Sequence, residues 1–269
     1  MSSETAALYV GSWRRLTNLS ADRKGSIHDD DAAKSLGFKS AFVPGSTVAT
    51  AAMPALVHCL GSRWMEGGWY RFTFVSPVYT DEDVREVAEE GTDGVALRVQ
   101  TRDERLCCSG VAGFGFRPPW RPEDDGRGAG DVLPGVEIGL TFEQEGFVTH
   151  EPDIQPLLAS AGDETPWYAD SSPWGRGVVP PERLHVFALQ ITRSRTLPVS
   201  GVRNPGMWAQ HDLVLRQPLF LDETYVMTER VADKGRSGRT AFLTYEFEVL
   251  DASGTQLAIG RHKVKWLAA

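Results

Sequence analysis

The residues of this chain best suited to proton transfer surround one histidine near the N-terminus. His28 stands directly before three aspartates, and Asp22 precedes it by six residues. An imidazole titrates near neutral pH and can share proton-transfer steps with a carboxylate through one water molecule. A structural role is the alternative, because acidic residues are favoured by the dipole at a helix start. That dipole disfavours a cation, so it explains the three aspartates but not the histidine.

A Pro-Gly-Ser turn separates this loop from a long apolar segment. Residues 46–60 are apolar nearly all round, which predicts a buried helix. Gly45 and Ser46 supply the turn and the cap before it. Pro54 lies inside the segment and should kink the helix or end its first turns. The elements expected to position His28 are therefore a loop, a short helix and this buried helix.

The sequence contains one internal repeat. Residues 69–84 and 208–226 each begin at a tryptophan, alternate as a strand does, and contain Pro-x-x-x-Asp followed by an acid, at an offset of 141 residues. A long strand pattern follows each copy. In the second copy, residues 244–250 alternate with period two, and residues 251–254 have the composition of a hairpin turn. Each half is therefore expected to end in an antiparallel sheet.

The repeat extends upstream to the histidine loop. Residues 27–33 correspond to residues 167–173, and His28 is matched by Tyr168 at an offset of 140 residues. A second Pro-marked turn then leads into another apolar segment, which predicts a second wrapped helix at roughly 181–192. Only the first copy carries a histidine at this position.

Together these features resemble the hotdog fold, and specifically the MaoC-like hydratase/dehydratase family in its tandem, double-hotdog form. Members of that family carry a loop of the type Gly-Asp-x-Asn-Pro-x-His-x-Asp, and a glycine-rich turn leads from it into the central helix. The second-half loop, AGDETPWYAD at 161–170, has Tyr168 at the histidine position. It matches the motif at Gly162, Asp163, Pro166 and Asp170.

The first-half loop, SADRKGSIHDD at 20–30, keeps the family's histidine and its last aspartate as His28 and Asp30. Asp22 corresponds to the first aspartate, although it lies six residues before the histidine where the family has five. Ser26 stands in place of the proline.

The resemblance implies an α+β fold of two hotdog units, each a long buried helix wrapped by an antiparallel sheet. The units are expected at 1–116 and 132–269, with 117–131, rich in proline, glycine and charge, as a linker. Single hotdog units dimerise edge to edge, so the two sheets should form one continuous surface. A homodimer of such double-hotdog chains is compatible with this arrangement.

The resemblance also implies a lyase that acts on a 2-enoyl or 3-hydroxyacyl thioester of coenzyme A or of a carrier protein. Water adds to or leaves the α,β bond, without a cofactor or a metal. His28 and Asp22 would be the catalytic acid/base pair. Backbone N–H groups at the helix start would stabilise the thioester oxygen as it gains negative charge. The candidate substrate-binding residues are Gly45, Ser46, Tyr168 and Asp163.

Two other functions stay open. The altered loop spacing and the missing Asn-Pro in the first half are compatible with a tailoring enzyme, such as a cyclase or isomerase, on a non-thioester substrate. A non-catalytic acyl-binding module is the other alternative, and substitution of His28 would then leave ligand affinity unchanged. For the lyase, we expect a pocket at the interface of the halves, lined by apolar and aromatic side chains.

Composition excludes several classes of protein. The 269 residues are 41% hydrophobic and 24% charged, as in ordinary globular proteins. No apolar run approaches the roughly 18 residues of a membrane helix, and the N-terminus lacks the pattern of a signal peptide. The net charge of −8 argues against binding to nucleic acid. We therefore expect a cytoplasmic protein without nucleic-acid or membrane partners.

The cysteines and the remaining helix histidines suggest no further site. Cys59, Cys107 and Cys108 are odd in number, which is typical of reduced thiols, and they lack a second pair at metal-ligand spacing. His58 and His185 fall in the two expected helices, where a histidine is more often a hydrogen-bonded core residue than a ligand.

Overall fold

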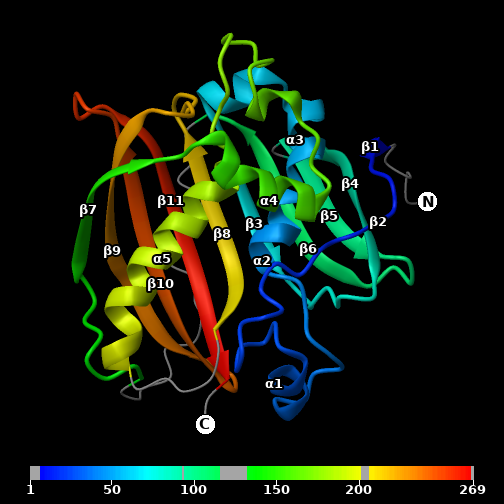
Figure 1. Ribbon diagram of the computed structural model, residues 1–269, viewed down its shortest axis with the longest axis vertical. Coiled ribbons are helices and arrows are strands. Elements are labelled where there is room, and N and C mark those ends of the chain that lie inside the picture. Colours follow the sequence, from blue (N-terminus) through cyan, green and yellow to red (C-terminus); the bar gives the residue numbers. More distant parts are fainter. Residues whose placement is uncertain (1–6, 93, 116–131, 201–205, 268–269) are drawn as a thin grey trace.

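The protein is described here from a computed structural model, which covers residues 7–92, 94–115, 132–200 and 206–267 (Figure 1). One eleven-stranded sheet has the order β1-β4-β5-β6-β3-β8-β11-β10-β9-β7, with β2 beside β4. The first-half strands are β1 Ala7–Val10, β2 Arg14–Arg15, β3 Gly68–Phe74, β4 Asp83–Gly91, β5 Gly94–Thr101 and β6 Leu106–Phe114. The second-half strands are β7 Thr141–Val148, β8 Met207–Leu215, β9 Thr224–Ser237, β10 Thr240–Leu250 and β11 Gln256–Leu267.

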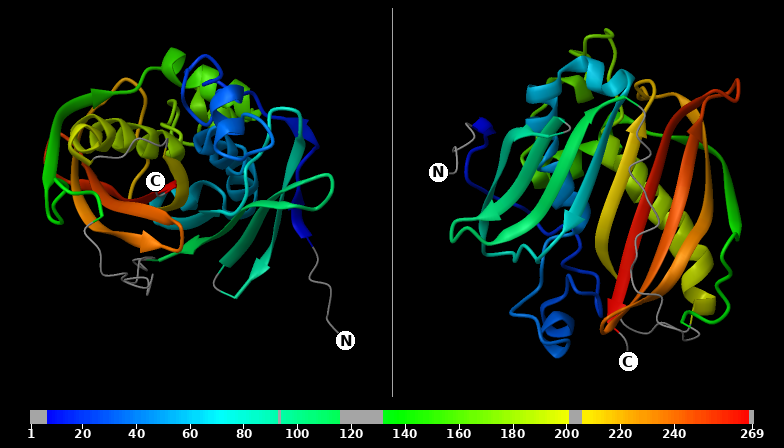
Figure 2. Two further views of the ribbon diagram at one scale, coloured as in Figure 1. Left: turned by 90° about the horizontal axis from the view of Figure 1, so that it is seen from below. Right: turned by 180° about the vertical axis from the view of Figure 1, so that it is seen from behind.

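The helices lie on one face of this sheet, which curves around them (Figure 2). They are α1 Asp30–Ser35, α2 Gly45–Thr50, α3 Met53–Leu60, α4 Glu151–Ala161 and α5 Pro181–Ser200, with two short 3-10 helices at Ser62–Glu66 and Pro166–Tyr168. A single hydrophobic core extends through both halves between the helices and the sheet. Among the described helices, none is both long and apolar enough to cross a membrane.

The halves join by antiparallel pairing of β3 with β8, so the two sheets form one continuous surface, as predicted. Arg71 lies directly opposite Asp212, and these residues are 141 positions apart, the offset of the sequence repeat. Because repeat-related residues face each other here, a pseudo-twofold axis passes between them. Nε of Arg71 donates to Oδ1 of Asp212 at 2.7 Å across this axis.

The hairpin of the second half follows from its sequence pattern. Tyr245, Phe247 and Val249 of β10 are buried, while Glu246 and Glu248 between them are partly exposed. The strand therefore packs one face on the core, as period-two alternation predicts. In the turn, Asp251 accepts hydrogen bonds from the backbone N–H groups of residues 253 and 255, which closes the connection to β11.

The structure corrects the predicted helices at three points. The segment 46–60 is not one helix, because α2 ends at Thr50 and α3 begins at Met53, with Pro54 in the first turn of α3. The break confirms the effect expected of the proline, because its ring clashes with the preceding turn of a continuous helix and it has no N–H to donate. His58 is exposed on α3 and not in the core. The second helix extends to Ser200, beyond the expected end.

Candidate active site

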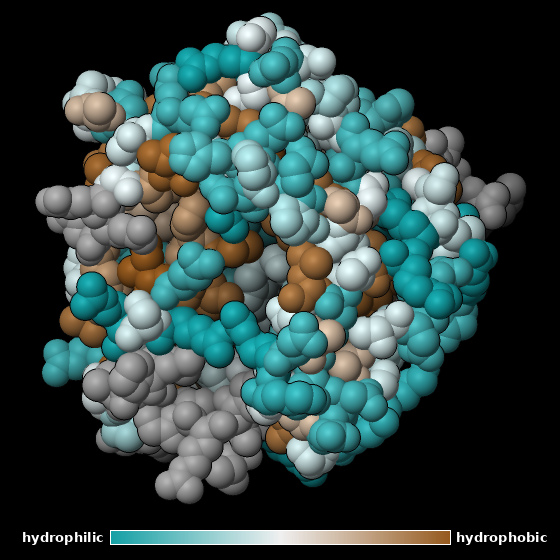
Figure 3. All heavy atoms as spheres, viewed as in Figure 1, coloured by the Kyte–Doolittle hydropathy of each residue, from teal (hydrophilic) through white to brown (hydrophobic). Residues whose placement is uncertain are grey.

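A cavity of about 1260 Å³ lies between the two halves, where a pocket was predicted. The loop around His28 and the start of α2 form its first-half wall, and α5, β8 and β11 form the opposite wall. Phe74, Trp208 and Trp266 give the cavity an aromatic lining. Figure 3 shows hydrophobic side chains around a hollow near the middle of this face, with hydrophilic residues at its rim. The volume exceeds the roughly 300–1,000 Å³ of common ligand pockets, so a long ligand can enter.

The half-buried ring of His28 lines this cavity in one defined tautomer. Its Nδ1 lies 2.7 Å from the carbonyl oxygen of Phe42. Since a carbonyl can only accept, Nδ1 carries the proton and Nε2 keeps a lone pair. In the described part of the chain, no group hydrogen-bonds to Nε2. The ring is therefore arranged as a base.

The surroundings of His28 favour its neutral form. Burial lowers the pKa of the imidazole, the Phe42 hydrogen bond partly opposes this, and the nearby Arg23 and Arg193 lower the pKa further. The neutral form therefore predominates at neutral pH. A neutral imidazole with a free Nε2 can take a proton from water or from an acidic carbon.

Asp22 is not brought to His28. Its side chain is exposed and does not line the cavity, because the backbone around it forms tight turns that direct it outward. The extra residue between Asp22 and the histidine is accommodated in these turns. Asp29 and Asp30 serve the loop itself, since they accept hydrogen bonds from the backbone N–H groups of Gly25 and Ala41.

Gly45 and Ser46 line the cavity at the start of α2. Within the described residues, no acceptor is bound to either backbone N–H group, so both can donate to a ligand. The structure also gives Gly45 a packing role. A Cβ at this position would lie 2.9 Å from the Cβ of Trp208, so only glycine lets α2 approach β8 this closely.

The second half repeats the loop geometry of the first. In each half, a residue of an isolated β-bridge donates its N–H to the carbonyl of the residue just before His28 or Tyr168. These hydrogen bonds run from Phe42 to Ile27 and from Val178 to Trp167. His28 and Tyr168 therefore occupy equivalent positions, as the repeat predicts.

The equivalent place in the second half is filled by protein. Tyr168 is only 1% exposed, and it does not line the cavity. Pro181 and Glu182 stand where the first half has Gly45 and Ser46. The hydroxyl of Tyr70, from the first half, donates to the buried carboxylate of Glu182.

Asp163 is also remote from the cavity. It is 6% exposed, and its Oδ1 accepts the N–H of Thr165 at 3.0 Å. Burial raises the pKa of this carboxyl to about 6, against the hydrogen bond from Thr165 and the positive charge of Arg14. Neither Asp163 nor Tyr168 is thus placed to touch a ligand in this cavity.

Three basic residues line the cavity that the sequence did not single out as a group: Arg23, Lys24 and Arg193. Arg23 and Arg193 come from opposite halves, and each lies close enough to His28 to lower its pKa. In the described ranges, neither arginine has a carboxylate partner. Two further arginines near Arg193 in the sequence could also meet phosphates, but Arg195 does not line the cavity and Arg203 lies outside the described residues. No local motif marks Arg23, because only the fold brings it to Arg193.

Solved structures share this architecture at low sequence identity. A protein described as a MaoC domain dehydratase from Chloroflexus aurantiacus is 13% identical with a TM-score of 0.63, over 98% of this chain and 95% of its own. A conserved Mycobacterium tuberculosis protein with a double hotdog fold is 13% identical with a TM-score of 0.60, over 96% and 97%. A protein described as an oleoyl thioesterase from Lactobacillus plantarum is 10% identical with a TM-score of 0.52, over 99% of each chain.

Comparison with protein-family models and with curated sequences finds no match. The structural likeness covers both halves and the seam between them. The protein therefore has the double hotdog fold, which solved structures described as MaoC-like dehydratases share over nearly the whole chain.

Proposed function

We propose that the protein is a hydratase or dehydratase that adds or removes water at the α,β bond of an acyl thioester. The observation that carries this proposal is the tautomer of His28, which leaves Nε2 free, in a residue that lines the same cavity as Gly45 and Ser46 with their unpaired N–H groups. The fold shared with structures described as dehydratases supports it.

In the hydration direction, Nε2 of His28 takes a proton from a water molecule, and the water oxygen forms a bond to the β-carbon. The π electrons of the double bond move toward the thioester, whose oxygen gains negative charge. The N–H groups of Gly45 and Ser46 donate to that oxygen. The imidazolium then returns its proton to the α-carbon. No described carboxylate hydrogen-bonds to the ring, so in this proposal His28 serves both proton-transfer steps in turn.

The cavity also supports an acyl thioester as substrate. Its aromatic lining suits an acyl chain, and its volume of about 1260 Å³ leaves room for a pantetheine arm. Arg23, Lys24 and Arg193 offer positive charge to the phosphates that coenzyme A and the carrier-protein arm share. These three side chains do not distinguish coenzyme A from a carrier protein, because both carry phosphate.

The test is an assay of the purified chain on a panel of 2-enoyl and 3-hydroxyacyl thioesters, each as coenzyme A and carrier-protein derivatives. We expect loss or gain of the ultraviolet absorbance of the conjugated thioester, without release of free thiol. Release of thiol would instead indicate a thioesterase, as the likeness to the Lactobacillus plantarum structure would allow. Binding without turnover would favour the acyl-binding module.

The pH dependence of the reaction should follow His28. Its pKa is lowered from the ordinary value near 6.5, and only the neutral ring can act as base. We therefore expect kcat/KM for hydration to be constant above about pH 6.5 and to fall below it, as the ring is protonated. An acid limb centred above pH 6.5 would contradict this assignment.

Tyr168→Phe should have little effect on catalysis. The change removes a hydroxyl that is buried and has no hydrogen-bond partner among the described residues. We expect turnover to stay within about threefold, and stability to be unchanged or to rise by about 1 kcal/mol, since an unpaired buried hydroxyl is unfavourable. Kinetic assays and denaturant unfolding measure both. A loss near a thousandfold would move the active site to the second half.

A further inference from the structure

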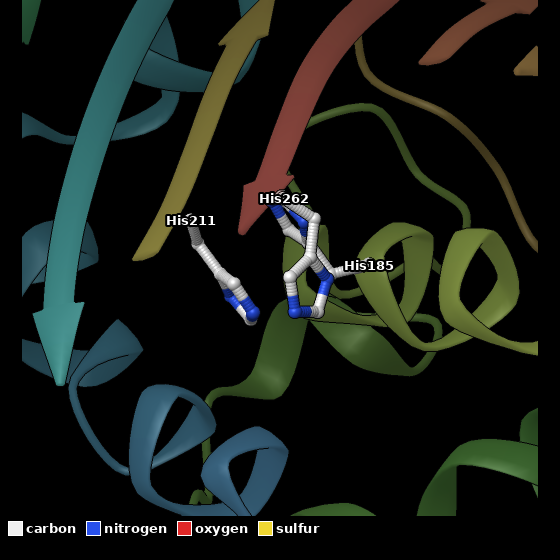
Figure 4. Close-up of side chains that lie close together, drawn as sticks. All are labelled: His185, His211 and His262. Atoms are coloured by element: carbon white, nitrogen blue, oxygen red, sulfur yellow. The ribbon is translucent and has the colours of Figure 1, made fainter. Parts of the chain in front are cut away.

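Three histidines meet in the core of the second half, and none of them lines the cavity (Figure 4). His185 lies on α5, His211 on β8 and His262 on β11. All three are 0% exposed, and one ring nitrogen of each lies within 4.8 Å of those of the others. Figure 4 shows the three side chains close together between the helix and the strands.

The hydrogen-bonding capacity of these rings is largely unused. Both nitrogens of His185, both of His262 and Nε2 of His211 are buried without a partner among the described residues. Each unpaired buried polar atom destabilises the folded state. His185 was expected to be a hydrogen-bonded core residue. It is buried in the core, but neither of its ring nitrogens is hydrogen-bonded within the described residues. A ligand that accepts nitrogen lone pairs would relieve this cost.

One ring is already oriented as metal-binding histidines usually are. Nδ1 of His211 lies 2.9 Å from Oε2 of Glu182, and the hydroxyl of Tyr70 holds the other carboxylate oxygen. A carboxylate on one imidazole nitrogen fixes the tautomer and leaves the other nitrogen free for a metal. Glu182 and Tyr70 thus act on His211 as outer-shell groups act on a metal ligand.

We propose that His185, His211 and His262 form a binding site for one divalent cation of the zinc type. Three imidazole nitrogens suit zinc, nickel or copper and not calcium or magnesium, which prefer oxygen, and a water molecule would be the fourth ligand. Zinc–nitrogen bonds of about 2.0–2.1 Å require ligand atoms about 3.4 Å apart in a tetrahedral site. The rings must therefore close, and His185 and His211, now stacked with 7° between their planes, must turn apart.

The role of the cation is structural. Trp208 lines the cavity. The centroid of its ring lies 4.2 Å from the ring centroid of His211 and 4.7 Å from that of His262. Trp208 therefore forms the wall between the cluster and the substrate space. A cation here joins α5 to the two strands beneath it and stabilises the second half, independently of whether the proposed hydration occurs.

The experiment uses the full chain, stripped with a chelator and then titrated with zinc chloride. We expect about one bound zinc per chain by calorimetry and a thermal midpoint that rises with zinc concentration. Cobalt substitution should give the visible bands of nitrogen ligation without thiolate charge-transfer absorbance. Failure of the folded wild type to bind zinc at micromolar free concentrations would overturn the proposal, as would thiolate bands, which would place the metal on a cysteine.

Variants locate the site. His262→Gln and His185→Gln should each weaken zinc binding by at least a hundredfold, and Glu182→Gln by about ten- to a hundredfold. His58→Gln and His150→Gln are matched controls, because both histidines are exposed, and binding should be unchanged. Equal loss in the controls would reveal an adventitious surface site and refute the assignment. If the core variants do not fold, the zinc stoichiometry and the cobalt spectrum of the wild type still test whether the histidines bind the metal.

Discussion

His28→Asn should lower the turnover of the proposed hydration by about a hundred- to ten-thousandfold while the protein remains folded. This range is typical of the loss of one positioned acid/base and corresponds to about 3–5 kcal/mol of transition-state stabilisation. Asparagine is the sharpest substitution, because its amide nitrogen can replace Nδ1 in the hydrogen bond to the Phe42 carbonyl. The loop should therefore keep its shape, and only the proton acceptor at Nε2 is lost.

The measurement compares kcat and KM of the purified variant with those of the wild type on any active thioester from the panel. KM should change little, since His28 contributes proton transfer and not uniform binding. Asp22→Asn is the control from the same loop, because that carboxylate is exposed and does not contact the ring. It should retain turnover within about twofold. Equal rates for wild type and His28→Asn would remove His28 from the mechanism.

The fold could be predicted because the two halves of the chain share a recognisable sequence repeat. The offset of 141 residues places Arg71 opposite Asp212 at the centre of the sheet, and the offset of 140 places His28 and Tyr168 in equivalent loops. Pro54 marked the break between α2 and α3 for a local reason, the geometry of its ring. Such features depend on residues that are close in sequence or repeated.

The parts of the site that were not predicted depend on contacts between distant segments. A one-residue change in loop spacing does not say which way Asp22 turns, because the intervening hydrogen bonds decide it. The need for glycine at position 45 arises from Trp208, which belongs to the other half.

The histidine cluster was missed for the same reason. His185, His211 and His262 come from three different elements with no ligand spacing between them. A histidine on an apolar helix face has the same sequence pattern whether its nitrogens are paired or not. Only the packed core shows that these nitrogens lack partners.

Arg71→Met should lower the free energy of unfolding by about 2–3 kcal/mol, because it removes the charge that compensates Asp212 at the seam. The Asp212 side chain is only 1% exposed, whereas that of Arg71 is 30% exposed. Burial raises the pKa of Asp212, and Arg71 is the first of the groups that oppose this. Gln210 also donates to the carboxylate, at 2.8 Å, which keeps the loss below that of a fully isolated buried charge.

Denaturant unfolding at several pH values measures this effect and identifies its cause. Without Arg71, the folded state holds the Asp212 proton to higher pH than the unfolded state, whose carboxyl titrates near 3.9. Stability of Arg71→Met should therefore fall further as the pH rises from about 4 toward neutrality, relative to the wild type. The double variant Arg71→Met/Asp212→Asn should lose this pH dependence and regain most of the stability, since no charge remains buried at the seam.

The matched control is Arg230→Met. Arg230 also lies directly opposite an acid, Glu246, on a neighbouring strand, and the two form an ion pair. That arginine is 59% exposed, so its pair is screened by water and should contribute less than about 1 kcal/mol. The two cross-strand arginine–acid pairs differ in the exposure of the arginine, and Glu246 also keeps Arg261 at 3.8 Å when Arg230 is replaced. An equal loss in both variants would mean that Arg71 acts through strand packing and not by neutralising a buried carboxylate where the two halves meet.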